Sequence, residues 1–284
     1  MNKNHESLSQ RLKKAGFSPS EIQSVFTGIA KMRAEEKSFL EYSDENWGAA
    51  FNASECFYTM IKQATAETAA YFDSLTEEEK SLKQYTFTAL FTLQNRASQQ
   101  YLEILTLVKN GFSDGAFARW RSMYELSVIS SFILKYGEVV AEKFIEASES
   151  QDRYDWAMAS GVFSEKKRHV TFGDLLKLCD MDAEVWKENY TVANQTVHAS
   201  PQGTFGRLGA QEGTGSDSQR SGYGIAAPAI HSANTLALIS SMLFSLYPDE
   251  KTMETMSLSA KWLDELIEIY CDTHEKLFPD DKEE

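Results

Sequence analysis

Residues 115–134 have the pattern of one helix that carries two opposite charges in otherwise apolar surroundings. Arg121 and Glu125 lie four residues apart and share a helix face, which Val128 and Phe132 continue. A buried charge without a partner is costly in free energy, so such charges are usually paired. This stretch therefore predicts a core-facing helix in which the arginine and the glutamate form an ion pair.

This predicted pair has two interpretations. A structural ion pair would fix the register of the helix, whereas a functional arginine would bind an anion or a phosphate while the glutamate holds its rotamer. An arginine offers five N–H donors, and one carboxylate takes only two of them. Further acceptors or a bound anion are therefore expected nearby.

A second polar group follows about seventy residues later. Tyr190, Asn194 and His198 recur at helical spacing, and Ser200 with Pro201 ends the helix behind them. The asparagine can fix the tautomer of the imidazole, and a histidine whose pKa stays near ~6.5 is a natural general acid or base. The alternative is a histidine that only caps the helix.

We expect both polar groups to converge in one pocket of a helical bundle. A third cluster, residues 152–156, is expected to lie near this helix with its aromatic side chains in the core. The catalytic candidates are His198, Arg121 and Glu125, and the supporting candidates are Tyr190, Asn194, Ser200 and His231.

The charge of the chain limits its partners. Its 284 residues include 28 Lys and Arg against 42 Asp and Glu, for a net charge of −14. Broad DNA binding and attachment to anionic membranes need a basic surface, so neither is expected. No apolar run approaches the ~18 residues of a membrane span.

The cysteines and glycines exclude several chemistries. Three isolated cysteines without metal-ligand spacing suit a reducing cytoplasm, which is the expected location. The glycines follow neither a phosphate-loop nor a dinucleotide-binding spacing, and no zinc or serine-hydrolase motif is present. We therefore expect no cofactor and no metal.

Capped helical segments dominate the chain, whereas strand patterns are nearly absent. Capping boxes are predicted at residues 18–21, 76–79 and 171–174. The second of these is expected to open one long helix that ends at Lys109, and a further helix is expected over residues 138–160. The pattern predicts an all-α bundle of about nine helices.

Three regions are expected along this bundle. Residues 1–47 would form an N-terminal helical hairpin or arm, with a hinge at residues 35–44, followed by the main bundle over 48–278 and an acidic tail over 279–284. Residues 201–226 are rich in glycine and predict a long loop that is mobile or closes over the site as a lid.

The polar residues resemble a bacterial all-helical family of unknown function. Its pattern is a Gly-x5-Arg-Ser-x2-Glu helix followed later by a His-x-Ser turn, and no activity comes with it. The residues that carry the resemblance are Gly115, Arg121, Ser122, Glu125, His198 and Ser200.

A more distant resemblance is to HEPN domains, which are helical bundles that include metal-independent RNases of stress and phage defence. Residues 194–198 match the histidine end of their motif, but residues 191–193 hold no arginine, so Arg121 would have to replace it. The resemblance implies a homodimer that acts on RNA. His198 would be the general acid or base, and the arginine would stabilise charge on the phosphate.

The alternative is a non-catalytic helical module that binds a small anionic ligand or another protein. Arg121, Glu125 and His198 would then form a structural polar network. The acidic composition and the missing motif arginine favour this second hypothesis.

Overall fold

The computed structural model describes residues 7–150, 153–164, 166–181, 183–198, 201–206 and 220–279. The predicted all-α class is confirmed, because these residues contain eleven α-helices, two short 3-10 helices and no strand. The helices are α1 Leu8–Lys14, α2 Pro19–Ser74, α3 Glu77–Ser81, α4 Gln84–Lys109, α5 Ser113–Tyr136, α6 Glu138–Glu146, η1 Ala147–Glu149, η2 Asp155–Ser160, α7 Phe172–Leu178, α8 Ala183–Val197, α9 Pro201–Phe205, α10 Ala226–Phe244 and α11 Glu250–Leu277.

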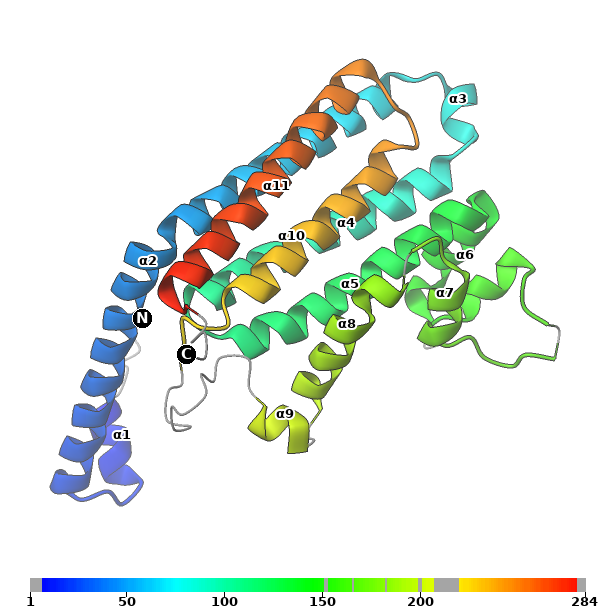
Figure 1. Cartoon of the computed structure of the whole chain (residues 1–284). Coiled ribbons are helices and arrows are strands. Elements are labelled where there is room, and N and C mark those ends of the chain that lie inside the picture. Colours follow the sequence, from blue (N-terminus) through cyan, green and yellow to red (C-terminus); the bar gives the residue numbers. More distant parts are fainter. Residues whose placement is uncertain are drawn as a thin grey trace, which may run out of the picture.

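Five long helices form the bundle. α4 packs against α5 and α10, α11 packs along α2, and α10 also contacts α5 and α11 (Figure 1). α8 covers the outer side of α5, while α6 and η2 lie at one end of α4. Large apolar side chains fill the space between the long helices, among them Trp47, Phe57, Tyr101, Trp120, Phe132 and Phe244.

Helix α5 crosses the core of this bundle. It follows the turn at Gly111 and ends at Gly137, whose φ of 76° is open to glycine without strain. Trp120 is fully buried on its inner face, and its indole Nε1 donates to the Thr235 hydroxyl of α10 over 2.9 Å. The burial of this face holds the outward residues of α5 in a fixed position.

The single helix predicted to end at Lys109 is wrong, because the structure has two helices there. Thr76 forms its capping box, but the box opens only the five-residue helix α3. The first turn of α4 is capped from a distance by the Glu138 carboxylate of α6, which accepts the backbone N–H groups of Tyr85 at 2.6 Å and Thr86 at 2.9 Å. A partner 53 residues away in sequence leaves no local signal.

The single helix predicted over residues 138–160 is also interrupted. α6 ends at Glu146, and η2 folds back on it as a separate short helix. Its Trp156 is buried, with the indole 5.0 Å from the ring of Phe144 and 5.9 Å from that of Phe132. Burial of this tryptophan against α5 and α6 favours the reversal over a continued exposed helix.

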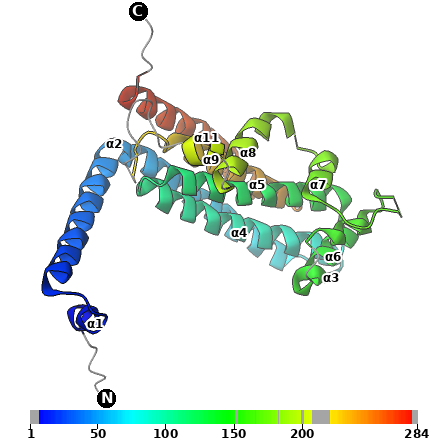
Figure 2. The same cartoon turned by 90° about the horizontal axis from the view of Figure 1, so that it is seen from below.

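The N-terminal part of α2 leaves the bundle together with α1 (Figure 2). Residues 35–44, where a hinge is predicted, are helical throughout. The helix turns away from the bundle without an interruption. Half of the predicted loop, residues 207–219, and the tail 280–284 lie outside the described residues, and the start of that loop is the short helix α9 instead. No described helix has the length and hydrophobicity that a membrane span requires.

Candidate functional site

The centre of the candidate site is the Glu125 carboxylate on α5, of which 7% is exposed. It accepts from three directions: Arg121 Nη2 lies 2.9 Å from one oxygen, Arg153 Nη2 lies 3.0 Å from the other, and the Tyr190 hydroxyl lies 3.2 Å from the first. The donors come from α5, from the residues that lead into η2, and from α8. The carboxylate therefore joins three separate segments.

Arg121 extends this cluster towards α8. Its Nε donates to the Asn194 side-chain oxygen, and its guanidinium carbon lies 5.6 Å from the centre of the Tyr190 ring. A quarter of its side chain, 25%, remains exposed. Asn194 therefore supports the arginine, whereas the sequence led us to expect it beside the histidine.

Burial and the Glu125 charge act together on the neighbouring phenols. Both raise the pKa of Tyr190, with burial the larger cause, and the same two causes raise the pKa of Tyr154. The Tyr190 hydroxyl therefore stays protonated over the physiological range and donates to the carboxylate. The cluster holds two guanidinium groups and one carboxylate, which leaves a local positive charge in an acidic protein.

Neither predicted histidine takes part in the hydrogen bonds of this cluster among the described residues. His198 directly follows α8, and its exposed imidazole makes no hydrogen bond or ion pair with the cluster among the described residues. His231 of α10 sits among the rings of Phe117, Trp120 and Trp186, and burial lowers its pKa to about 4. Ser200 lies outside the described residues.

Arg153 is the member of the cluster that sequence reasoning left out of the site. Its segment is expected to lie near Arg121, but nothing in the spacing indicates that it would share the glutamate with that arginine. The only available signal was the count of donors, since one carboxylate can accept from two guanidinium groups at once.

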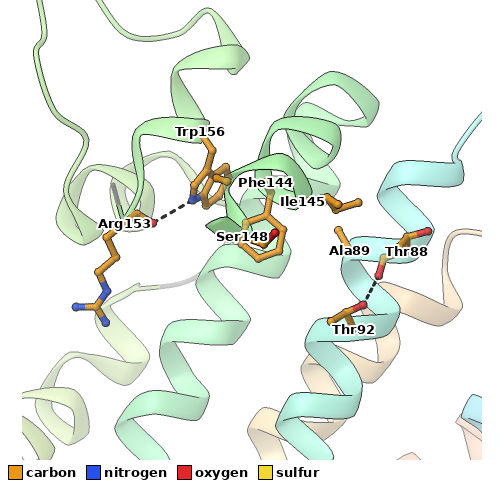
Figure 3. Close-up of a pocket in the computed structure, with 9 residues that line it drawn as sticks. Thr88, Ala89, Thr92, Phe144, Ile145, Ser148, Arg153 and Trp156 are labelled. Carbon is orange, nitrogen blue, oxygen red and sulfur yellow. Dashed lines mark hydrogen bonds between the residues drawn. The ribbon is translucent and has the colours of Figure 1, made fainter. Parts of the chain in front are cut away.

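An apolar pocket of about 340 Å³ lies beside the cluster, between α4, α6, η1 and η2 (Figure 3). Arg153 links the two features: its backbone carbonyl accepts from the Trp156 indole at 3.1 Å, while its guanidinium points away from that ring towards α5. The lining residues are Thr88, Ala89, Thr92, Phe144, Ile145, Ala147, Ser148, Arg153 and Trp156.

The floor and the rim of this pocket differ in chemistry. Ala89 and Trp156 are buried in the floor, beside Phe144, whereas Thr88 and Thr92 are exposed at the rim one turn apart on α4. Within the described ranges, no group of three or more His, Cys, Asp or Glu side chains is placed to hold a metal. The arrangement suits binding of an apolar molecule more directly than metal chemistry.

The fold and site define an all-helical bundle with a buried, shared carboxylate beside an apolar pocket. Residues 87–159 match the model of a family of unknown function, DUF5677. No curated protein and no solved structure matches the chain. The matched segment includes every residue that lines the pocket, together with Arg121 and Glu125, and it ends before α8. The family match therefore covers the pocket and three members of the polar cluster, Arg121, Glu125 and Arg153. Tyr190 and Asn194 lie beyond it.

Proposed function

We propose that this protein is a non-catalytic helical module that binds a small, largely apolar molecule in the pocket between α4, α6 and η2. The cavity is the observation that supports the proposal. Its volume of about 340 Å³ is at the lower end of the ~300–1,000 Å³ range of small-molecule sites, and its floor is apolar. Its lining lies wholly within the segment that matches the family model.

The hydrogen-bonding state of the rim indicates what such a molecule would carry. The Thr88 hydroxyl donates to the Gln84 carbonyl at 2.8 Å, and the Thr92 hydroxyl donates to the Thr88 carbonyl at 2.8 Å. Because each hydroxyl has one hydrogen, both can only accept from a ligand. The guanidinium of Arg153 points away from the Trp156 ring and binds Glu125. An uncharged ring system with one N–H or O–H donor therefore fits best.

The polar cluster has a supporting role in this proposal. Glu125 bonds Arg153, whose backbone carbonyl in turn holds the Trp156 indole at the edge of the pocket. The carboxylate thus fixes one wall of the pocket without facing the ligand. This assignment corresponds to the structural interpretation of the Arg121–Glu125 pair.

Filling the pocket is expected to weaken binding of a neutral aromatic probe. N-phenyl-1-naphthylamine has fused rings and one N–H donor, and its fluorescence rises in apolar sites. Ala89→Phe places a ring in the floor of the pocket. We therefore expect the dissociation constant of the probe to rise at least about tenfold, about 1.4 kcal/mol. Fluorescence titration of the full chain measures this change.

The matched control is Ala49→Phe, which adds the same ring at an exposed position of α2 outside the pocket. Thr88→Val keeps the shape of the rim but removes an acceptor. Thr88→Val should weaken binding of the amine probe and leave binding of 1-phenylnaphthalene, which has no N–H donor, unchanged. Equal probe affinity for the wild type and Ala89→Phe would exclude this pocket as the binding site.

The alternative proposal is an HEPN-like, metal-independent RNase in stress or phage defence. One observation favours it: Asn194, which binds Arg121, lies one turn before His198 on the same helix, so the arginine is held near that helix end. The histidine would serve as general acid or base, and the arginine would stabilise the phosphate.

This alternative predicts that His198→Ala abolishes RNA cleavage and growth inhibition on expression. His169→Ala is the matched control, because His169 is an exposed histidine on a loop that bonds Asp155 at 3.0 Å and, within the described residues, no side chain of the cluster. Cleavage of total RNA by each purified variant is the measurement. If the His198→Ala variant cleaves RNA as fast as the wild type, the nuclease proposal is excluded.

A further inference from the structure

The N-terminal arm, defined here as α1 and residues 17–42, is the least covered described part of the molecule. α1 has no buried residue, and in residues 19–42 only Ile22 is buried. Large apolar side chains are instead exposed along it, up to 57% for Met32. The exposed apolar residues are Leu8, Phe17, Phe26, Met32, Leu40 and Tyr42. Such a cluster on a soluble chain indicates a docking surface.

The charge of the arm is opposite to that of the body. The arm holds six basic and four acidic residues, and the excess lies in α1, which contains Arg11, Lys13 and Lys14 and no acidic residue, whereas the whole chain has 28 basic and 42 acidic residues. The arm therefore complements a surface that is acidic and partly apolar. The net charge of the whole chain, −14, disfavours a polyanion such as RNA or an anionic membrane as the occupant.

Helix α11 presents an acidic surface. Residues 262–275 contain five acidic residues and no Lys or Arg, and all five are exposed: Asp264, Glu265, Glu268, Asp272 and Glu275. The opposite face of α11 packs on α2, where the Trp262 indole donates to the Ala53 carbonyl at 2.9 Å. The Tyr270 and Ser54 hydroxyls also lie 2.9 Å apart. The acidic side chains are therefore exposed to solvent. The C-terminal end of α11 lies beside the root of the arm, which is the part of α2 where the arm leaves the bundle (Figure 1).

The arm is held in a fixed direction at this root. Arg220 binds Glu36 at 2.9 Å and the Asn110 carbonyl at 3.0 Å, and its guanidinium carbon lies 4.7 Å from the centre of the Phe112 ring. The turn at Gly111 contacts Phe39 of α2. Both views show the arm directed away from the bundle, and therefore away from its own α11 (Figures 1 and 2).

We propose that this arm docks on the acidic face of α11 of a second copy of the chain, so that two copies exchange arms. In a two-fold arrangement the same arm–α11 contact forms twice, which doubles the buried apolar surface and the charge pairing. The arm root lies beside α11, so a partner that approaches this end of the bundle meets both surfaces at once. An arm that is already held in place loses little entropy on docking.

A charge exchange tests this contact in the full chain. Arg11→Glu with Lys13→Glu changes the charge of α1 from +3 to −1, and Glu265→Lys with Glu268→Lys lowers the negative charge of residues 262–275 from −5 to −1. We expect each pair of changes to raise the dimer dissociation constant at least about tenfold, measured by analytical ultracentrifugation. All four changes together should restore it to within about threefold, because the new glutamates of α1 can pair with the new lysines of α11. Met32→Glu should weaken the dimer both in the wild-type chain and in the chain that carries all four charge changes.

The control is Glu77→Lys with Glu78→Lys on α3, which makes the same change of charge at exposed acidic residues outside α11 and should leave the dimer unchanged. Circular dichroism confirms that each variant keeps its helices. A chain that is monomeric at about 100 µM, or a dimer that the four-residue exchange does not restore, overturns the proposal. Arm-dependent binding of a 30-nucleotide RNA or of phosphatidylserine vesicles by a monomer would overturn it in favour of that partner.

Discussion

Replacing Glu125 with alanine is expected to lower the free energy of unfolding by about 3 kcal/mol. Loss of one partner from a buried ion pair costs ~3–5 kcal/mol, because the remaining charge is left without compensation. The lower end applies here, since Arg121 is 25% exposed and Arg153 is 71% exposed, so water can solvate both guanidinium groups in part. Urea unfolding followed by circular dichroism measures the change.

The matched control is Glu41→Ala. Glu41 pairs with Lys37 at 3.5 Å with the same spacing of four residues, but both side chains are exposed, 63% and 78%. Exposed pairs of this kind contribute ~0–1 kcal/mol. Equal shifts in the urea midpoint for the two variants would show that burial of the Glu125 carboxylate has no consequence for stability.

Replacing Gly111 with alanine is expected to cost about 2–4 kcal/mol. Its φ is 74°, a conformation that costs a residue with a Cβ about 1–2 kcal/mol. The added Cβ would also contact the Phe39 ring and lie 2.9 Å from the Ser221 backbone nitrogen, and relieving such overpacking typically costs ~1–3 kcal/mol. Thermal unfolding measures the loss, which is expected to include detachment of the arm root.

Gly137→Ala separates the two causes. Gly137 has nearly the same φ, 76°, but no atom lies within 4 Å of an added Cβ. This control should therefore show only the backbone cost of about 1–2 kcal/mol. A loss as large as that of Gly111→Ala would mean that the contact with α2 and residue 221 is unimportant.

Local signals predicted the helices well where a helix end depends on nearby residues. The boxes at Ser18 and Thr171 form as expected, because the capping side chain and the backbone N–H that it accepts are three residues apart. The Arg121–Glu125 pair forms for the same reason, since its spacing places both groups on one face. Tyr190 and Asn194 likewise share the face of α8 that meets α5.

The sequence by itself therefore determined the all-α class, several helix starts and the pairing within α5, because these depend on residues within about one helical turn of each other. Only the tertiary structure decided that Glu138 caps α4, that Arg153 shares Glu125, and that α4, α6 and η2 leave a pocket between them. The two contacts join residues 28 and 52 positions apart, and the pocket brings α4 together with two later segments of the chain. Their meeting depends on how whole helices pack, and no local pattern records that packing.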